Sequence, residues 1–257
     1  MWQIRSRIQR EVTVSWIANQ KLVVKRGMTG ATGNIYVGLH EFADMMFVLH
    51  VLRRDDLFLD IGANVGAYTV LAAGVCKSSA LAFEPDPKTI VDLRRNIEVN
   101  GLENLVTVHN VALGATEGEI SFTVGLDTVN RVVSQRGAHY QLVQQRSLDS
   151  VLGDLEFNTA FAKVDVEGYE EEVLRGAEHF LAKQSVKAIE LETVTQGIQE
   201  LLSRHQFERA FYDPFRRLLS RQPVRLGSSN ALFVKDFSFV CSRVREAPKM
   251  RVLGFSI

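Results

Sequence analysis

Hydrophobic and polar positions follow a mixed pattern up to about residue 56, and a regular one after it. Within residues 1–38, hydrophobic and polar residues alternate in the short stretches EVTVSWI and KLVVK, and the following RGMTGATGN is rich in turn residues. Together these stretches predict a small β-rich extension. The next segment places apolar residues at helical spacing, namely Phe42, Met45, Met46, Leu49 and Leu52. We therefore expect an amphipathic helix before the main fold.

From residue 57, apolar runs of strand length alternate with amphipathic stretches of helix length. Strands are expected in LFLDIG (57–62), ALAFE (80–84), LVTVHNVAL (105–113), AFAKVDVEG (160–168), VKAIELE (186–192), FERAFYD (207–213) and NALFVKD (230–236). Helices are expected in VGAYTVLAAGVC (65–76), DPKTIVDLRRNIEVNG (86–101), YEEEVLRGAEHFLA (169–182) and QGIQELLSRHQ (196–206). This alternation predicts an α/β fold, in which helices cover both faces of a mostly parallel, seven-stranded sheet.

The rhythm also predicts the domain organisation. Residues 1–39 form an N-terminal extension, residues 40–257 form one domain, and residues 115–147 interrupt it as a β-rich insertion containing GEISFTVG and YQLVQQRS. In doubly wound sheets, ligands bind at the carboxyl ends of the strands. The polar residues discussed below all follow expected strands, so we expect them to share one site.

Composition narrows the classes of partner. Lys plus Arg and Asp plus Glu are both 30, so the net charge is zero, and the basic excess typical of nucleic-acid binders is missing. Cys76 and Cys241 have no spacing typical of a zinc site or a disulfide framework. The N-terminus does not resemble a secretory signal, and no apolar stretch approaches the ~20 residues of a membrane span. We expect a cytoplasmic protein without a nucleic-acid partner, of undetermined oligomeric state.

The first expected strand runs into LDIGANVGAYT (59–69), a glycine-bearing turn that opens a helix. A dinucleotide would place its pyrophosphate at this helix N-terminus, but the carboxylate of Asp60 would repel it. Asp60 would instead attract a ligand with an ammonium and a sulfonium, such as S-adenosylmethionine (SAM). Gly62 would let the ligand approach the backbone, Gly66 would let the helix pack closely, and Asn64 tolerates a left-handed conformation. The alternative is a tight turn whose acid only caps the helix.

An acid also follows the second expected strand, where Glu84 lies 24 positions after Asp60. A carboxylate at this place can accept hydrogen bonds from both ribose hydroxyls, which would serve SAM and NAD alike. After the third strand, Asn110, Val111 and Ala112 are placed to supply the apolar wall and amide contact of an adenine site, although such residues are also ordinary at strand ends. Together these positions predict an adenosine ligand.

The fourth expected strand ends in KVDVEGYE, where Lys163, Asp165 and Glu167 alternate and so point to one face if the strand stays straight. Burying a carboxylate without partners is costly, so Asp165 should face a polar cleft. There it can act as a general base, orient a nucleophile or hold a metal. The acids of the following helix start need no such role, because acids stabilise helix N-termini.

Two further features carry weaker signals. Glu190 and Glu192 end the fifth expected strand, as Asp165 ends the fourth. Some methyltransferases hold Mg²⁺ with acids at the ends of the fourth and fifth strands. Two carboxylates alone are a weak metal signal, so we expect no metal. His40 opens the helix before the core and could line a substrate entrance.

Taken together, the motifs resemble the FkbM-type methyltransferases. The segments that carry the resemblance are FLDIGANVGAYTVLAA, AFEPDPKTIVDLRRNIEVNG, VHNVALGATEGEISF, RSLDSVL, AKVDVEGYEEEVLRGAEHFL and AIELE, all within about residues 40–195, and SSNALFVK (228–235). The resemblance implies a Rossmann-like class I fold and SAM-dependent methylation of a hydroxyl on a sugar or natural-product acceptor. It assigns SAM to Asp60, Gly62, Asn64, Gly66 and Glu84, and it places KVDVEGYE at the reaction cleft.

We therefore expect a SAM-dependent O-methyltransferase acting on a small-molecule or glycan acceptor. The sulfonium already activates the methyl group, so the enzyme needs mainly in-line positioning and a proton acceptor. Asp165 is the expected proton acceptor or orienting group, with Glu167 assisting and Lys163 stabilising a developing alkoxide. N-methylation and SAM binding without turnover are the alternatives, and the DVEG sequence after the fourth strand argues against methylation of nucleic-acid bases.

Overall fold

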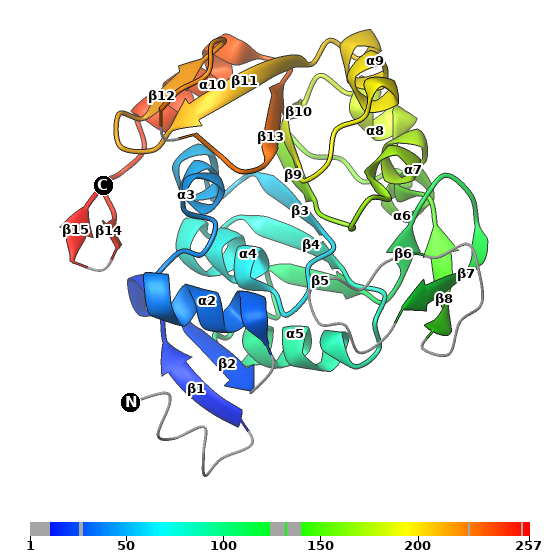
Figure 1. Ribbon diagram of the computed structural model, residues 1–257, viewed down its shortest axis with the longest axis horizontal. Coiled ribbons are helices and arrows are strands. Elements are labelled where there is room, and N and C mark those ends of the chain that lie inside the picture. Colours follow the sequence, from blue (N-terminus) through cyan, green and yellow to red (C-terminus); the bar gives the residue numbers. More distant parts are fainter. Residues whose placement is uncertain (1–10, 26–27, 124–131, 133–139, 226, 253) are drawn as a thin grey trace.

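The computed structural model describes residues 11–25, 28–123, 132, 140–225, 227–252 and 254–257. At its centre is an eight-stranded sheet in the order β12-β11-β13-β10-β9-β3-β4-β5 (Figure 1). The strands are β3 (Leu57–Ile61), β4 (Ser79–Phe83), β5 (Val106–His109), β9 (Ala160–Val164), β10 (Val186–Leu191), β11 (Glu208–Asp213), β12 (Leu218–Ser220) and β13 (Ala231–Val234). Neighbouring strands in the series β10, β9, β3, β4 and β5 pair in parallel, whereas β13 is antiparallel to both β10 and β11.

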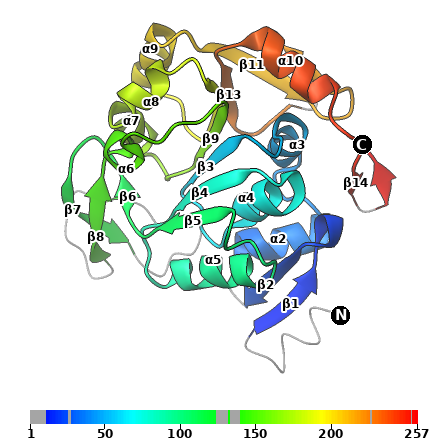
Figure 2. The same ribbon diagram turned by 180° about the vertical axis from the view of Figure 1, so that it is seen from behind.

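Helices cover both faces of this sheet (Figures 1 and 2). One face packs against α3 (Phe42–Val51), α4 (Ala67–Thr69) with the π-helical η2 (Val70–Cys76), α5 (Thr89–Glu98) and α10 (Phe237–Arg245). The other face packs against α6 (Leu148–Leu152), α7 (Glu170–Arg175), α8 (Glu178–Ala182) and α9 (Gln196–Arg204). A hydrophobic core lies on each face of the sheet, and successive residues of β3 point into opposite cores. Phe58 packs in the core on the first face and Leu59 in the core on the second. The predicted α/β fold with a mostly parallel sheet is confirmed.

Several local predictions were wrong. The sheet has an eighth strand, because the chain after β11 turns back at residues 214–217 and pairs as β12. The stretch LVTVHNVAL breaks after His109, and β6 (Ala112–Leu113) joins a separate three-stranded sheet with β7 (Gly118–Thr123) and β8 (Tyr140–Arg146). The helix expected over residues 169–182 is divided into α7 and α8 around Gly176, where a Cβ would lie 2.0 Å from the carbonyl oxygen of Gly114.

The N-terminal extension contains the expected strands, since β1 (Glu11–Ser15) and β2 (Lys21–Lys25) form a hairpin across the short η1 (Ile17–Asn19). The turn-rich stretch after them instead forms α2 (Thr29–Val37). The hairpin rests on the main fold, because the N–H of Val23 donates to Oδ1 of Asn96 on α5, whose Nδ2 donates to the carbonyl of Val65. The division at residue 39 stays a prediction.

The insertion expected over residues 115–147 contains β7 and β8, and its stretches 124–131 and 133–139 lie outside the described residues. The chain ends in a small pair formed by β14 (Arg251–Val252) and β15 (Phe255–Ser256). A search of the described residues finds no helix with the length and apolar character that crossing a membrane requires.

Candidate functional site

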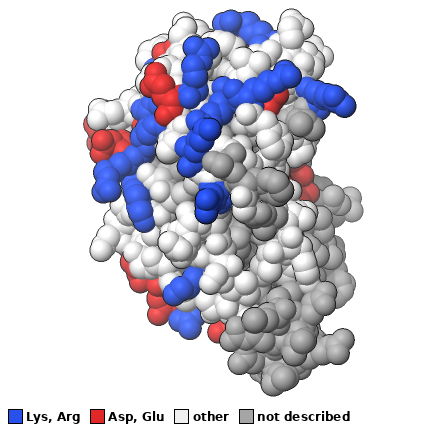
Figure 3. Space-filling view, turned by 90° about the vertical axis from the view of Figure 1, so that its left-hand side faces the viewer, with Lys and Arg blue, Asp and Glu red and all other residues white. Residues whose placement is uncertain are grey.

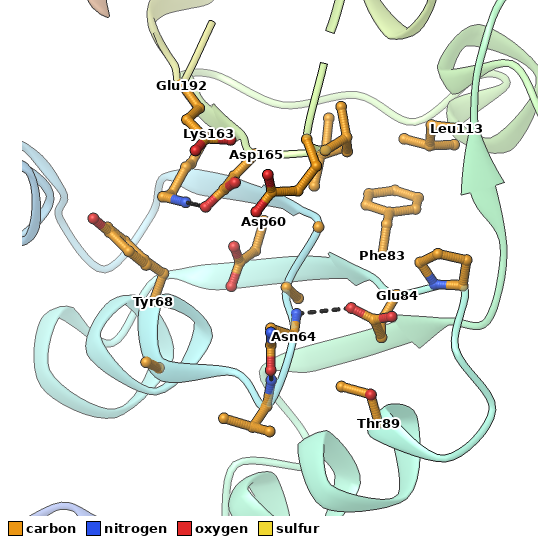
Figure 4. A pocket seen from close by; sticks show the side chains of 18 of the residues that line it. Asp60, Asn64, Tyr68, Phe83, Glu84, Thr89, Leu113, Lys163, Asp165 and Glu192 are labelled. Carbon is orange, nitrogen blue, oxygen red and sulfur yellow. Dashed lines mark hydrogen bonds and ion pairs between the residues drawn. The ribbon is translucent and has the colours of Figure 1, made fainter. Parts of the chain in front are cut away.

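A cavity of about 290 Å³ opens at the carboxyl ends of β3, β4, β9 and β10, the edge at which doubly wound sheets bind ligands. Side chains of different character line its two ends (Figure 4). One end includes Phe83, Glu84, Thr89 and Leu113, and the other includes Tyr68, Lys163, Asp165 and Glu192. Most of the residues that the sequence singled out therefore meet in one place.

The turn after β3 is held in a left-handed backbone conformation at three positions, with φ of 81° at Gly62, 50° at Asn64 and 85° at Gly66. A Cβ on Gly66 would lie 2.4 Å from Cδ1 of Leu93, so Gly66 does let the following helix pack closely. A Cβ on Gly62 would lie 1.8 Å from the carbonyl oxygen of Asp165, so this glycine lets the ends of β3 and β9 approach each other. Their contacts with a cofactor stay predictions.

Asp60 lies on β3 just before this turn and is 2 % exposed. Its Oδ2 accepts a hydrogen bond from the Thr69 hydroxyl at 2.5 Å. Its register partner on β9 is Lys163, whose partner on β10 is Glu190, so acid, ammonium and acid form a row across three strands. Burial raises the pKa of Asp60, and the charge of Lys163 opposes the rise.

Glu190 completes this row, but the described lining of the cavity does not include it. Burial raises its pKa well above the ordinary value, and its Oε1 has no hydrogen-bond partner among the described residues. Burial therefore favours the protonated, neutral form of Glu190 beside Lys163. The next acid along, Glu192, is the one that reaches the cavity.

Glu84 lies just beyond β4 and is fixed by the backbone around it. Its Oε2 accepts the N–H of Asn64 and its Oε1 accepts the N–H of Asp86, each at 2.9 Å. Burial raises the pKa of Glu84 to about 7, the two N–H donors oppose the rise, and the nearby Asp86 and Asp60 add to it. Each carboxylate oxygen retains a lone pair for a hydroxyl donor, as ribose recognition requires.

The three residues expected near an adenine divide into two groups. Val111 and Ala112 line the cavity. Asn110 is exposed, and its Nδ2 donates to the carbonyl oxygens of Glu84 at 2.8 Å and Pro85 at 3.0 Å. Asn110 therefore ties the loop after β5 to the loop after β4, and so helps to position Glu84.

Lys163 is 3 % exposed and is surrounded by acids. Its Nζ forms an ion pair with Asp165 and lies 4.5 Å from the centre of the Tyr68 ring. Burial acts to lower the pKa of Lys163, but the carboxylates of Asp165, Glu41 and Asp60 outweigh it and raise the pKa. Burial acts to raise the pKa of Asp165, yet the ammonium of Lys163 brings it below the ordinary value. The pair is therefore charged at neutral pH.

Asp165 also shares a side-chain hydrogen bond with Glu192, just after β10. Burial and the adjacent Asp165 raise the pKa of Glu192 to about 8, so the shared proton resides on Glu192 at neutral pH. Carboxylate oxygens of Asp165, Glu167 and Glu192 lie within 4.8 Å of one another. Oxygen sets of this kind can bind Mg²⁺. The expectation of no metal, made from two carboxylates, is untested.

Residues from before the first core strand also reach the cavity. Glu41 accepts a hydrogen bond from the Tyr68 hydroxyl at 2.7 Å, and His40 lines the cavity. Asn34 on α2 accepts the N–H of His40 at 2.9 Å and so holds this segment in place. Sequence reasoning missed Glu41 and Tyr68, because an acid before a helix and an aromatic residue within one are both ordinary.

Comparison with known proteins identifies relatives of the chain. The profile of the Methyltransferase FkbM domain matches residues 60–221. "Methyltransferase 1" of Beauveria bassiana is 27% identical over 159 residues, which cover 52% of this chain and 64% of that protein. "Hexuronic acid methyltransferase AglP" of Haloferax volcanii is 30% identical over 147 residues, 56% of this chain and 59% of that protein. The matches thus span about three fifths of these relatives.

Solved structures show more distant likenesses. A precorrin-6y C5,15-methyltransferase from Geobacter metallireducens GS-15 is 14% identical with a TM-score of 0.43, covering 83% of this chain and 92% of that one. TrmK of M. capricolum, solved with S-adenosyl-homocysteine, is 12% identical with a TM-score of 0.44, covering 75% of this chain and 68% of that one. Neither likeness is close enough to bear on substrate.

Proposed function

The chain belongs to the FkbM methyltransferase family, and on that premise we propose that it transfers the methyl group of SAM to a hydroxyl oxygen of a sugar or similar polyhydroxyl acceptor. The observation that carries this proposal is the two-ended cavity. Glu84 and an apolar wall form one end, and the Lys163–Asp165 ion pair lies at the other. An adenosine cofactor and a hydroxyl acceptor need these two environments side by side.

The residues of the first end fit SAM. Glu84 would accept hydrogen bonds from the ribose hydroxyls, and Val111 and Ala112 would contact the adenine. Asp60 and the turn at Gly62 would face the methionine portion, whose ammonium and sulfonium suit an acidic surrounding. A dinucleotide fits less well, because the buried carboxylate of Asp60 stands at the turn that its pyrophosphate would need.

When bound, SAM supplies an electrophilic methyl group on a sulfonium. Asp165 would accept a hydrogen bond from the acceptor hydroxyl, orient its oxygen towards the methyl group and receive its proton as the new bond forms. Lys163 holds the Asp165 carboxylate in place and puts a positive charge near the oxygen. Glu167 lies in the same turn, with a φ of 53°, and would help to orient the acceptor.

The charge of the cavity favours a neutral acceptor. Its described lining contains six acids and a single lysine, which are Glu41, Asp60, Glu84, Asp165, Glu167, Glu192 and Lys163. Even with Glu192 protonated and cationic SAM bound, the other five acids would outnumber the cations and repel a phosphate or an unpaired carboxylate, so nucleic acid is a poor acceptor. The relative named as a hexuronic acid methyltransferase supports a sugar acceptor, but the acids here favour an uncharged sugar unless a divalent cation intervenes.

The test is methyl transfer from isotopically labelled SAM to a matched panel of methyl hexosides, 2-amino-hexosides and hexuronides, with Asp165→Asn as the background. Parallel reactions contain Mg²⁺ or a chelator. We expect label on an oxygen of a neutral hexoside, identified by NMR, with equal rates in both conditions.

Each other outcome has a distinct meaning. Label on the amino group would establish N-methylation. Tight SAM binding by calorimetry without label on any acceptor would favour a binding protein without turnover. Transfer to the hexuronide that requires Mg²⁺ would assign Asp165, Glu167 and Glu192 to a metal site and overturn the preference for a neutral acceptor.

A further inference from the structure

Although the chain is neutral as a whole, its charges are strongly segregated along the sequence. Residues 204–257 contain eleven Lys and Arg and four Asp and Glu, whereas residues 1–203 contain nineteen and twenty-six. In the fold, many of these cations gather on the part of the surface formed by α10 and the β11–β12 hairpin (Figure 3). The acidic cavity and this basic surface are therefore distinct regions of the molecule.

Contacts between elements make this region one continuous surface. Helix α10 packs against both β12 and α3. Nη2 of Arg53, after α3, donates to the carbonyl of Arg243 on α10 at 2.7 Å. Arg217, from the hairpin turn, donates to the carbonyl of Ala247 beyond α10. We call this surface the basic face and define it by its exposed cations, which are Arg54, Arg216, Arg225, Arg245, Lys249 and Arg251.

Most cations of the basic face are available to a partner. Arg216 has a side chain that is 79% exposed and only a 3.9 Å contact with Asp213. The other five form no ion pair with any described residue. By contrast, the neighbouring Arg221 and Arg243 are paired with Glu208 and Asp56 and serve the fold. Unpaired like charges on one surface repel each other, and an anionic partner would relieve that repulsion.

Exposed apolar side chains accompany these cations. Phe215 is 58% exposed and Leu218 is 40% exposed, and both lie on the hairpin beside Arg216. The Phe215 ring packs on Phe42, with 5.3 Å between ring centres. Phe42 directly follows Glu41, which lines the cavity. The tip of the hairpin thus connects the basic face to the acceptor end of the site.

We infer that the basic face docks on the surface of a bilayer that contains anionic lipids. Arginine and lysine next to exposed aromatic and aliphatic side chains match such a surface, where headgroups bind the cations and the interface accepts apolar groups. Nucleic acid fits less well, because single strands stack successive bases on several aromatic rings, and Phe215 is the one strongly exposed ring on the described part of this face. Docking would bring the cavity close to acceptors held at the membrane.

The test is sedimentation with phosphatidylcholine vesicles that contain or lack phosphatidylglycerol, at low and high salt. The full chain is compared with the triple variant Arg245→Gln/Lys249→Gln/Arg251→Gln. The matched control is Lys21→Gln/Lys88→Gln/Arg94→Gln, which removes three exposed cations from elsewhere on the surface and changes the net charge equally. Circular dichroism melts check that both variants fold, and Phe215→Ala tests the apolar contribution separately.

We expect salt-sensitive binding to the anionic vesicles alone. Each basic side chain near such a surface contributes roughly fivefold, so the first triple variant should lose about tenfold to a hundredfold in partitioning. The control triple variant should bind the vesicles almost as well as the wild type. Phe215→Ala alone should bind them more weakly than the wild type. Equal losses in the two triples, no binding at low salt, or binding to single-stranded RNA but not to vesicles would each overturn the inference.

Discussion

The ammonium of Lys163 and the carboxylate of Asp165 form an ion pair with 2.5 Å between Nζ and Oδ2, in which the lysine side chain is 4% exposed and the aspartate 28%. The lysine is therefore the more deeply buried of the two, and the aspartate is the more exposed in the cavity that both line. This asymmetry suits the proposed roles, in which Lys163 positions the carboxylate of Asp165 and Asp165 receives the proton. It leads to the first prediction.

Replacing Asp165 with Asn removes the carboxylate that we propose as the proton acceptor but keeps the side-chain volume. If Asp165 takes the proton of the acceptor hydroxyl, single-turnover methyl transfer should fall by about 10²–10⁴-fold. SAM affinity, measured by calorimetry, should change little, because the residues expected to bind the cofactor lie on β3 or after β3, β4 and β5. Wild-type rates in the folded variant would remove Asp165 from the chemistry and leave Glu167 and Glu192 as the groups to test.

The environment of Glu84 predicts that SAM binding depends on pH. In the proposed complex, ribose hydroxyls donate to the ionised carboxylate, and burial raises the pKa of this carboxylate to about 7. SAM affinity should therefore rise as the pH increases through about 7 and then level off. Glu84→Gln should abolish this dependence and lower affinity at high pH by roughly tenfold to a hundredfold. A wild-type profile that is flat from pH 6 to pH 8 would contradict the assignment.

The same shift has a consequence for stability. The folded state binds the Glu84 proton more tightly than the unfolded chain, whose glutamates titrate near about 4.3. The contribution to the free energy of unfolding is thus fully present below the unfolded value and is lost as the pH rises through about 7. Urea unfolding without SAM should show this loss in the wild type, and a smaller one in Glu84→Gln.

Much of this candidate site could be predicted from the sequence, because the positions of its residues depend on local patterns. A residue that ends a buried strand must lie at the carboxyl edge of the sheet, so the strand pattern alone brings Asp60, Glu84 and Lys163 to one edge. Left-handed conformations at Gly62 and Asn64 likewise follow from residue type. These features need no knowledge of distant contacts.

The remaining features depend on contacts between distant segments. Nothing near Glu41 in the sequence shows that it will meet Tyr68, because the approach of α3 to the first turn is a matter of tertiary packing. Strand alternation also could not predict which of Glu190 and Glu192 reaches the cavity, because alternation places both on one face of the strand. The difference arises because β10 ends at Leu191, between them. Strand β12 was missed because three residues after a turn carry too little pattern.

The pairing of Asp165 with Glu192 predicts the pH dependence of the chemical step. Burial and repulsion from Asp165 raise the pKa of Glu192 to about 8, so near neutrality the pair still holds one proton. Loss of that proton makes the pair a better acceptor, and the single-turnover rate should rise as the pH increases through about 8. In Glu192→Gln the rise should disappear. An unchanged profile in this variant would show that the proton of Glu192 plays no part.

The contact of Gly62 with the end of β9 gives the last prediction. Gly62→Ala places a Cβ 1.8 Å from the carbonyl oxygen of Asp165, at a φ of 81°. The matched control is Gly101→Ala, which has a φ of 64° and nothing within 4 Å of the added carbon. The control should lose about 1–2 kcal/mol in the free energy of unfolding for the left-handed conformation alone.

Gly62→Ala should lose about 1–3 kcal/mol more than this control, because a backbone carbonyl must move. That movement would also displace Asp165 and the turn that we expect to face the cofactor, so SAM affinity should fall in Gly62→Ala and stay at the wild-type value in Gly101→Ala. Urea unfolding and calorimetry on both variants measure the two effects. Equal losses of stability would mean that the strand ends can separate freely, and that the close approach of β3 to β9 does not constrain the site.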